Sequence, residues 1–521
     1  MAVTAKKKRK RKCRIVKKKK IVDGKKKLVK VKKCKPRRKP KPKPAPTPAP
    51  VYPPAPVVTA PPVPPPPPPP RLKVIKSPIA VFGGTFGRKQ AERLAWRAGF
   101  GPRPGQLDAL VGMDLEAAVM SFTRPTGVAP LDGPEPTRDG TNPIELGRDE
   151  GAAMYWLDRM ARSRHQLVER LALVFHDWWA TRRDGIANNA EMLEQVNVFR
   201  AHGLGSFRDM TRAMTGNAAM LRFLNGDRNR RGAVNENYGR ELMELFTLGA
   251  DRGAYTEDDV RQIAKALTGW TTPQVDGVTI PRYDEEGRWD FSVKTIFGKS
   301  GRFTWEDACE LVLTHPLHPS FFVRKLWGYF IPTPPSAAES KALEQLYVSS
   351  NLAIRPVLEA ILCHPAFYEG ATMVKPPIVL SAGMLRAQER TVGTYNWHYV
   401  GDRSGQQLHF PPDVSGWNDL RWLDTNTTVG RWDLVREGLR GKVITGTARD
   451  TYPEETPEQA LAGARAFWGD PSLSDATVAQ LKAFATAAPI TGTATQMAQR
   501  RAQRFNALRQ LVAASPDYQT C

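Results

Sequence analysis

A histidine and a carboxylate on one predicted helix are the first candidates for chemistry in this chain. The segment Arg164–Thr181 is apolar nearly all round, which predicts a central helix that is buried on both faces. At 100° per residue, His176 lies on the same side of this helix as Glu169, two turns away. A buried histidine that shares a face with a carboxylate is suited to act as a base or a ligand. The position equally suits a core histidine that holds two helices together.

A second predicted helix, over Asn235–Gly249, carries the other candidates. Arg240 stands four residues from a glutamate on each side, as in a solvated ladder of ion pairs. Asn237 and Glu241 flank the apolar stripe, so we expect Glu241 to be half-buried and to need a polar partner. If the two helices met, these three residues and His176 would form the polar site of a hydrolase-like enzyme, with or without a metal ion.

Patterns that specify a cofactor are missing from the sequence. No Glu-x-x-His or His-x-x-x-His pair occurs at helical spacing, and there is no Gly-x-Ser-x-Gly elbow or phosphate-binding Gly-x-x-x-x-Gly-Lys-Ser/Thr loop. The sequence therefore predicts no metal ligands and identifies no cofactor.

Positive charge is concentrated at the start of the chain. The formal net charge of the 521 residues is +25, but residues 1–50 hold 24 Lys and Arg against one acidic residue, Asp23. The remaining 471 residues carry 53 basic and 51 acidic groups, a balance of only +2. We expect residues 1–43 to bind an anionic polymer, nucleic acid without sequence specificity, or an anionic lipid surface. The densest cationic positions are Lys6, Lys7, Lys8, Arg9, Lys10, Arg11, Lys12, Lys17, Lys18, Lys19 and Lys20.

The basic segment also contains a signal for a β-hairpin. Asp23-Gly24 is typical of a two-residue hairpin turn and lies between short runs of β-branched residues. A turn there pairs positions whose numbers sum to 47, so Val16 faces Val31 and Cys13 faces Cys34. The cysteines then occupy a non-hydrogen-bonded pair, close enough for a disulfide. The alternative is a disordered polycation in which the two cysteines match by coincidence.

A proline-rich stretch separates the basic segment from the rest of the chain. Residues 36–70 contain 19 of the 45 prolines, and Pro64–Pro70 are seven in a row. We expect a polyproline II spacer over 44–78, attached to a globular body over 79–521. No apolar run is long enough for a membrane span, and no signal peptide can be recognised, which favours the cytoplasm. A Cys13–Cys34 disulfide would instead favour export or the cell surface.

Apolar residues beyond residue 90 mostly recur at intervals of three and four, which predicts a mainly α-helical body. Strand-like alternation is nearly absent, except for a Gly-, Pro- and Asp-rich excursion near 271–303 with short β-prone pieces. The expected helices are Ala91–Ala98, Gln106–Phe122, Gly151–Ala180, Ala190–Ala201, Phe207–Leu224, Asn237–Leu248, Thr256–Leu267, Thr304–Leu313, Pro319–Phe330, Ala337–Ser349, Arg355–Leu362, Pro377–Glu389, Ser474–Ala487 and Thr495–Ala514.

An ordered series of short motifs resembles the large bacterial family called domain of unknown function 1800. The motifs are Glu92-Arg93-Leu94, Arg97-Ala98-Gly99-Phe100-Gly101, Phe175-His176-Asp177-Trp178-Trp179-Ala180-Thr181, Asn235-Glu236-Asn237-Tyr238, Arg240-Glu241-Leu242, Leu248-Gly249, Tyr255-Thr256, Leu267-Thr268-Gly269-Trp270, Pro411-Pro412-Asp413-Val414-Ser415-Gly416-Trp417, Leu508-Arg509-Gln510-Leu511 and Ser515-Pro516. The resemblance covers about residues 82–521 and leaves the tail outside.

The resemblance implies a mostly helical fold but no activity, because the family is named for having none assigned. Its members are often exported and are often encoded beside a sulfatase-like partner family. They typically have a second histidine where Trp178 stands, and a His-Asp pair where this chain has Trp289-Asp290. Two histidines of a possible shared metal site are therefore replaced here.

Two functional hypotheses follow. In the first, the polycationic arm tethers the body to an anionic surface and the body binds another protein. In the second, the body is a hydrolase-like enzyme that uses His176, Asn237, Arg240 and Glu241.

Overall fold

The computed structural model describes residues 13–22, 25–34, 79–127, 129–136, 147–275, 277–446 and 455–521. The chain divides into two units, Met1–Leu72 and Lys73–Cys521. In the first unit, strand β1 (Cys13–Val22) pairs antiparallel with β2 (Lys25–Cys34). Cys13 lies opposite Cys34 and Val16 opposite Val31, which are the pairs expected from the sequence. The predicted proline spacer 44–78 and the cationic positions Lys6 to Lys12 lie outside the described residues.

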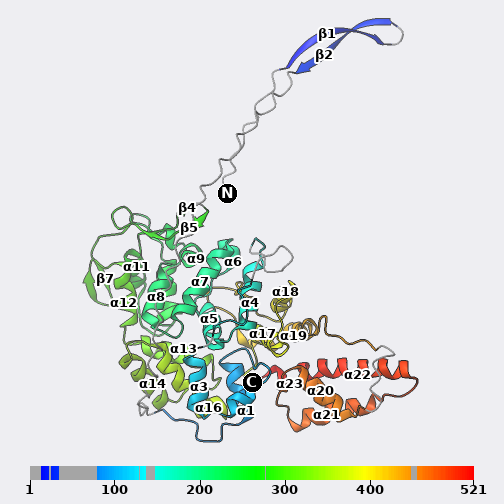
Figure 1. Ribbon diagram of the computed structural model, residues 1–521. Helices are drawn as coiled ribbons and strands as arrows, with labels where there is room; N and C mark the ends of the chain where they lie inside the picture. Colours follow the sequence, from blue (N-terminus) through cyan, green and yellow to red (C-terminus); the bar gives the residue numbers. More distant parts are fainter. Residues whose placement is uncertain are drawn as a thin grey trace, which may run out of the picture. The chain divides into compact units, whose positions relative to one another are not determined.

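The second unit is mainly α-helical, which confirms the predicted fold class (Figure 1). Its first half contains α1 (Arg88–Arg97), α2 (Gln106–Val111), α3 (Leu115–Thr123), α4 (Gly151–Arg162), α5 (Gln166–Trp178), α6 (Arg183–Ile186), α7 (Asn189–His202), α8 (Phe207–Thr215), α9 (Ala218–Phe223), the 3₁₀ turn η1 (Gly226–Arg228), α10 (Asn237–Glu241), the π-helix η2 (Leu242–Thr247) and α11 (Glu257–Ala266). Its second half contains α12 (Trp305–Leu313), α13 (His318–Gly328), α14 (Ala337–Ser349), α15 (Ile354–Leu362), α16 (Pro365–Tyr368), α17 (Pro377–Ala387), α18 (Asn396–Arg403), the 3₁₀ turn η3 (Asp419–Leu423), α19 (Thr425–Gly438), α20 (Pro457–Phe467), α21 (Asp475–Ala487), α22 (Ala494–Ala514) and α23 (Pro516–Gln519).

The expected β excursion consists of three separate two-stranded ladders between α11 and α12. β3 pairs with β6, β4 with β5 and β7 with β8, all antiparallel. Their bounds are β3 (Trp270–Thr271), β4 (Gln274–Val275), β5 (Val278–Thr279), β6 (Arg282–Tyr283), β7 (Lys294–Ile296) and β8 (Lys299–Gly301). The three ladders do not join into a common sheet, so this region is an irregular insertion between two helices of the body.

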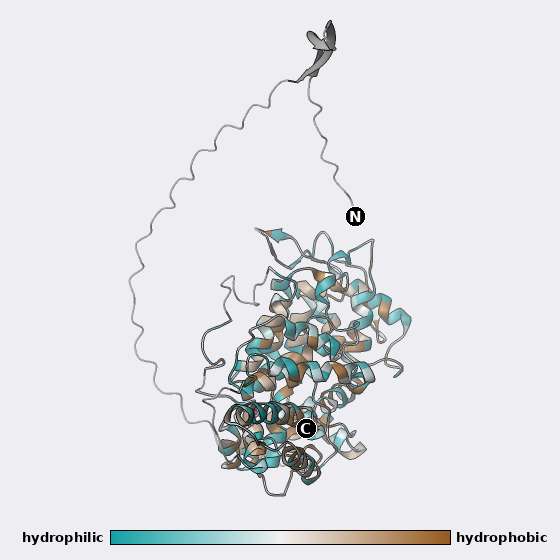
Figure 2. Cartoon of the chain, turned by 90° about the vertical axis from the view of Figure 1, so that its right-hand side faces the viewer, coloured by the Kyte–Doolittle hydropathy of each residue, from teal (hydrophilic) through white to brown (hydrophobic). Residues whose placement is uncertain are grey.

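Helix α5 lies at the centre of the body and is buried on both faces, as the sequence predicts. Leu171, Val174 and Trp178 on one side, and Leu173 on the other, are each at most 2% exposed. The indoles of Trp178 and Trp179 contact Phe207 at centroid distances of 5.5 and 5.3 Å. Figure 2 shows apolar residues distributed through the helices of the body. The apolar contacts of α5 therefore fix the positions of the helices around it.

The region predicted as one helix over Gly151–Ala180 is two helices, α4 and α5. Ser163 between them joins Leu131 in an isolated β-bridge. Buried Arg386 of α17 donates hydrogen bonds to the carbonyl oxygens of Met160, Ala161 and Ser163 at 2.8 to 3.3 Å. These hydrogen bonds pair the last carbonyl groups of α4, so the helix can end here without leaving buried backbone oxygens unpaired.

Arginines elsewhere in the body also bind carbonyl groups. Arg97, at the end of α1, is 2% exposed and donates to the backbone oxygens of Phe330, Phe367, Ala371 and Cys521 at 2.8 to 3.2 Å. Arg93, one turn earlier, donates to the oxygens of Phe367, Tyr368 and Gly370. Arg93 and Arg97 therefore connect α1 to three distant segments, at Phe330, at residues 367–371 and at Cys521.

The helix that begins with α10 widens into the π-helix η2, which the sequence did not predict. A π-turn shifts carbonyl groups out of the α-helical pattern, and such turns are frequent near functional sites. Here Leu245 accepts a hydrogen bond from Lys325 Nζ at 3.1 Å, and Phe246 accepts one from Trp178 Nε1 at 3.1 Å. The oxygen of Thr247 lies 2.8 Å from Nδ1 of His318. Side chains of α5 and α13 thus stabilise the wide turn.

The last helices, α20, α21 and α22, pack side by side and project from one side of the body in Figure 1. The chain then returns, and Thr520 forms a β-bridge with Val374. Among the described residues, no helix has both the length and the apolar character needed to cross a membrane.

Candidate ligand-binding cavity

A cavity of about 520 Å³ opens between α1, α5, α13 and the loop that precedes α19. This volume is within the range of small-molecule sites. Its walls combine ionisable groups with indole rings and aliphatic side chains. The residues that matter for its chemistry are Arg97, Arg170, Asp177, Lys325, Tyr329, Asp419, Trp96, Trp417, Trp422, Leu420 and Leu423.

Arg170 of α5 is the least satisfied cation in the cavity wall. Its side chain is only 6% exposed, and Nε donates to the oxygen of Arg97 at 3.3 Å. Among the described residues, none accepts a hydrogen bond from its two terminal amino groups. Burial lowers the pKa of Arg170 to about 10, so the guanidinium remains charged at neutral pH. A buried, charged fork without a protein acceptor is suited to binding a carboxylate, phosphate or sulfate.

Asp177, two turns after Arg170 on α5, accepts hydrogen bonds from two donors. Tyr329 donates through its hydroxyl to Oδ2 at 2.7 Å, and the backbone N–H of Trp417 donates to Oδ1 at 2.6 Å. Burial raises the pKa of Asp177, while these two hydrogen bonds oppose the shift. Gly416 is required at this contact, because a Cβ atom there would lie 2.3 Å from Oδ1 and its φ is +94°. The carboxylate therefore fixes the loop that carries Trp417.

Lys325 of α13 supplies a second cation beside Asp177. Its Nζ donates to the oxygen of Leu245 in the π-helix and lies 4.9 Å from the ring centre of Trp178. Burial lowers the pKa of Lys325 to about 8, and the charge of Asp177 opposes this shift. Lys325 therefore titrates close to neutral pH and responds to a negative charge brought into the cavity.

The charges and surfaces of the cavity together indicate the kind of molecule that fits. Three cationic side chains, Arg97, Arg170 and Lys325, face the carboxylates of Asp177 and Asp419. Cys521 also lines the cavity, and its negative charge partly opposes the lowering of the Arg170 pKa. The indoles of Trp96, Trp417 and Trp422 offer flat apolar surfaces. At the mouth, Leu420 is 86% exposed and Leu423 is 54% exposed. A ligand with an anionic group and a ring or apolar body complements this arrangement.

The predicted site residue His176 is fully buried behind the cavity wall. Its ring contacts Trp156, His409 and Trp417 at centroid distances of 5.4, 5.2 and 5.5 Å. Only Trp417 also lines the cavity. His176 is thus a buried neighbour of the cavity rather than part of its surface.

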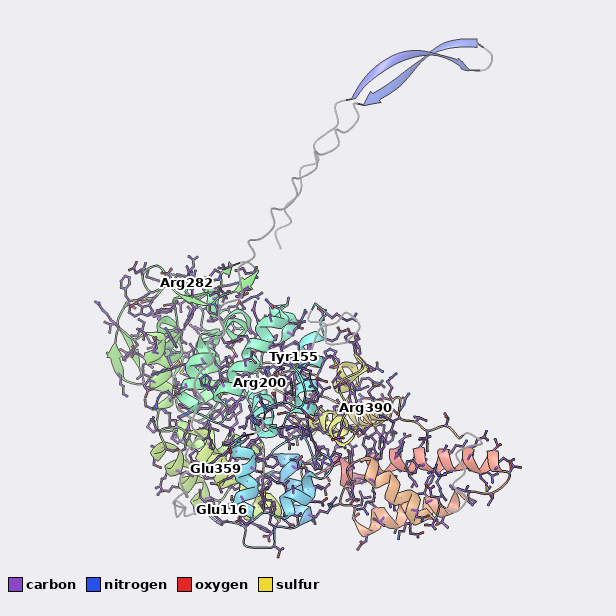
Figure 3. All side chains as sticks on the ribbon, viewed as in Figure 1. Glu116, Tyr155, Arg200, Arg282, Glu359 and Arg390 are labelled. Carbon is purple, nitrogen blue, oxygen red and sulfur yellow. The ribbon has the colours of Figure 1, made fainter. Side chains whose placement is uncertain are left out.

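Glu169, which shares a helix face with His176, has other partners. Its carboxylate accepts hydrogen bonds from Trp156 Nε1 at 3.0 Å, Arg159 at 3.2 Å and Arg200 at 2.8 Å. Figure 3 labels Arg200, which reaches this carboxylate from α7. The carboxylate is therefore engaged by two arginines.

The other predicted site residues lie on α10, away from the cavity lining. Arg240 pairs with Glu257 at 2.7 Å and with Glu236 at 3.4 Å. Glu241 is half-buried, as expected, and burial raises its pKa together with the nearby charge of Glu244. None of Asn237, Arg240 and Glu241 lines the cavity, and no contact to His176 is found for them within the described part of the chain. The contacts of the described residues therefore do not bring His176 together with Asn237, Arg240 and Glu241, the four residues of the hydrolase hypothesis.

Sequence motifs include only some of the residues that line the cavity. Asp177 and Trp417 stand in motifs that carry the family resemblance, whereas Arg170, Lys325 and Tyr329 have no motif of their own. The one local signal is that Lys325 and Tyr329 are spaced i, i+4 at the end of a predicted helix, and this spacing alone is typical of residues on a helix surface. In the described residues no three His, Cys, Asp or Glu side chains are grouped as metal ligands.

A family model described as "Protein of unknown function (DUF1800)" matches residues 93–520, which are 428 of the 521 residues. The chain belongs to this family. Comparisons with curated proteins and with solved structures find no significant match. The N-terminal tail lies outside the DUF1800 match, as the sequence predicts.

Three of the DUF1800 motifs meet at the cavity. The first places Arg97 in its wall, the second Asp177 and the third Trp417. Arg97 binds carbonyls from three other segments, and Asp177 binds the backbone of Trp417. In this DUF1800 protein, residues more than 300 positions apart in the sequence thus build one cavity.

Proposed function

We propose that the helical body is a binding module for a small molecule with an anionic group and an aromatic or apolar ring. The observation that carries this proposal is the buried guanidinium of Arg170, whose terminal amino groups have no acceptor among the described residues. Buried polar groups are nearly always hydrogen-bonded in native proteins. An anion bound to Arg170 supplies the missing acceptor.

The other walls of the cavity fit the remainder of such a ligand. Lys325 adds a positive charge on α13, across from Arg170 on α5. The indole of Trp417 is held in place through its backbone bond to Asp177. The ring of the ligand packs against Trp417 and Trp422, and its far end reaches the exposed leucines at the mouth.

Replacement of Arg170 by methionine is expected to weaken the binding of a naphthalenesulfonate probe about tenfold to hundredfold, because a hydrogen bond to a charged group contributes about 1.5–3 kcal/mol. Fluorescence titration measures the dissociation constant. Arg355→Met is the matched control, since Arg355 is exposed on α15 and lies outside the cavity lining. Naphthalenesulfonamide, which lacks the charge, should bind both proteins alike. Equal affinity of the wild-type and Arg170→Met proteins for the sulfonate would contradict the proposal.

If the body is a hydrolase, the groups that support catalysis are those of the cavity and not His176, Asn237, Arg240 and Glu241. Asp177, Tyr329 and Lys325 are the groups in the cavity that can exchange protons, and Lys325 titrates near pH 8. In the same protein samples, turnover of a chromogenic phosphate, sulfate or carboxylate ester that is lost in Lys325→Met would assign catalysis to the cavity. Turnover unaffected by this change would exclude it.

We further propose that the N-terminal arm tethers the body to an anionic polymer or surface. Residues 1–50 carry +23 of the formal charge of +25, and part of this segment forms the β1–β2 ladder. Binding through many lysines to phosphate or sulfate groups is strong at low salt and carries no sequence specificity. Binding of another protein, such as a sulfatase-like partner, is a proposal that rests on the family resemblance alone.

Deletion of residues 1–70 is expected to abolish retention on immobilised heparin at low ionic strength, because nearly all the excess positive charge is removed. Elution from the column over a salt gradient measures the effect. The full-length protein should elute at high salt and the shortened one in the flow-through. Unchanged retention would show that the body provides the anion-binding surface.

A further inference from the structure

Lys325 of α13 places a primary amine in the wall of the cavity, where its side chain is partly exposed. Its Nζ donates one hydrogen bond, to the oxygen of Leu245 at 3.1 Å. The same atom lies 4.9 Å from the ring centre of Trp178 and 5.7 Å from that of Phe321. An ammonium group has three N–H donors, so two of them have no acceptor among the described residues.

Two other lysines of the body are more deeply buried, and their amines are bound differently. Lys294 is 0% exposed and donates to two backbone oxygens. Lys375 is 1% exposed and donates to the oxygen of Tyr518 at 2.6 Å. Neither lysine lines the cavity, and within the described part of the chain no carboxylate forms an ion pair with Lys325. Of these three amines, only that of Lys325 is open to a molecule in the cavity.

A phenol and a carboxylate that share a proton stand in the same wall. Tyr329, one turn after Lys325, donates to Oδ2 of Asp177 at 2.7 Å. Burial lowers the pKa of Lys325 to about 8, and the charge of Asp177 opposes this shift. Part of the amine is therefore unprotonated at neutral pH. A lysine amine that is desolvated in this way is a nucleophile for carbonyl compounds.

The rest of the cavity limits which carbonyl compounds fit. Arg170 offers the terminal amino groups of its guanidinium to an anion. The indoles of Trp417 and Trp422 offer flat apolar surfaces to a ring. A bound molecule that meets both features lies in the same cavity as the amine of Lys325, which raises the effective concentration of its carbonyl group at that amine.

We propose that Lys325 forms a covalent imine with an aldehyde or ketone that also carries an anionic group and a ring. This reaction rests on the ligand site proposed above, because that site holds the carbonyl compound. The nitrogen of Lys325 forms a bond to the carbonyl carbon, and the carbonyl oxygen leaves as water with both hydrogens of the neutral amine. Asp177 is the carboxylate of the cavity that can carry protons from the nitrogen to the oxygen. Neither an oxidant nor a reductant is consumed, and addition of water reverses the reaction.

Reductive trapping of the full-length protein with 4-formylbenzoate tests the imine. Cyanoborohydride reduces the imine to a stable secondary amine, and mass spectrometry of the digested protein measures the labelling rate at each lysine. We expect Lys325 to be labelled at least about tenfold faster than Lys341, because binding holds the aldehyde at the cavity amine. Lys341 is the matched reference, since it is exposed on α14 and lies outside the cavity lining. Labelling of Lys325 that is no faster than that of Lys341 would overturn the proposal.

Two variants assign the rapid label to one amine. Lys325→Arg is expected to remove it, because arginine keeps the positive charge but has no primary amine. Lys341→Arg should retain the rapid label, which the unlabelled naphthalenesulfonate should slow by competition. A rapid label that survives in Lys325→Arg would contradict the assignment.

The same samples separate the imine from the anion site. Rapid labelling of Lys325 that Arg170→Met leaves unchanged would support the imine and contradict the role of Arg170. Naphthalenesulfonate binding that depends on Arg170, without rapid labelling of Lys325, would support the anion site and overturn the imine alone.

Discussion

Acidification from pH 7 to pH 4 is expected to lower the free energy of unfolding by several kcal/mol. Three buried histidines are responsible. Burial lowers the pKa of His176 to about 3 and that of His318 to about 4, and it lowers the pKa of His409 well below its usual value. In the unfolded chain each titrates near pH 6.5.

The direction follows from proton binding in the two states. Between about pH 6.5 and pH 4 the unfolded chain takes up a proton on each histidine and the folded protein does not, so stability falls as the pH falls. The cost is about 1.4 kcal/mol per pH unit for each group, or about 3 kcal/mol per histidine by pH 4. The total approaches the whole stability of an ordinary domain, which implies acid unfolding.

The groups around these histidines modify the effect only in part. Gln195 opposes the shift at His176, and the carbonyl of Thr247 opposes it at His318. Positive charge on His176, His398 and Arg200 reinforces the lowering of the His409 pKa, whereas a backbone hydrogen bond with Ala152 opposes it. Asp177 acts in the opposite direction, because its raised pKa lets the folded protein accept a proton earlier.

Urea unfolding at pH 7, 6, 5 and 4, with a chelator present, measures this dependence. His176→Phe should reduce the slope of stability against pH by about a third, since one of three titrating groups is gone. His202→Asn is the control that should leave the slope unchanged. A wild-type stability that is flat between pH 7 and pH 4 would show that the three imidazoles are not held neutral by the fold.

Replacement of Arg386 by lysine or methionine is expected to destabilise the protein by at least about 3 kcal/mol. The 1%-exposed guanidinium donates to the carbonyls of Gly101, Met160, Ala161 and Ser163, and no carboxylate contacts it in the described structure. Each carbonyl left buried and unpaired costs about 1–3 kcal/mol. Lysine keeps the charge but has no planar fork to span four oxygens, so it should not rescue stability.

Arg390 provides a matched comparison for this change. It follows α17, is labelled in Figure 3, and donates to the carbonyls of Gly438 and Arg440 at 3.0 and 3.1 Å. Because Arg390 is half-exposed, water can replace it, and Arg390→Met should cost about 1 kcal/mol. Thermal and urea unfolding of the variants give the difference. An Arg386→Lys protein as stable as the wild type would show that a positive charge alone is enough to stabilise the turn between α4 and α5.

The sequence predicts the helical fold well because apolar periodicity is a local property. Helix α5, with its two buried faces, follows directly from its residues. The break between α4 and α5 does not, because it depends on Arg386, more than 200 residues away. The π-helix was also missed, since its carbonyls are satisfied by Lys325, Trp178 and His318 from other helices.

The candidate site depends even more on distant contacts. The sequence predicts His176 as a site residue because it shares a helix face with Glu169. In the structure, Arg159 and Arg200 bind that carboxylate, and the imidazole that contacts His176 is that of His409. Nothing in the local sequence around His409 distinguishes it from a loop histidine. Its burial, at 1% exposure, and its φ of +64° become visible only when the loop is folded against α5.

The carbonyl-binding arginines also change the meaning of the charge balance. Seven buried cationic side chains, against four buried carboxylates, are found among the described residues of the body. Seven of the 53 basic side chains in residues 51–521 are therefore directed inward, where backbone carbonyl groups bind most of them. The outer surface is more acidic than the balance of +2 suggests, so a negatively charged polymer would meet attraction at the arm and little or none at the helices.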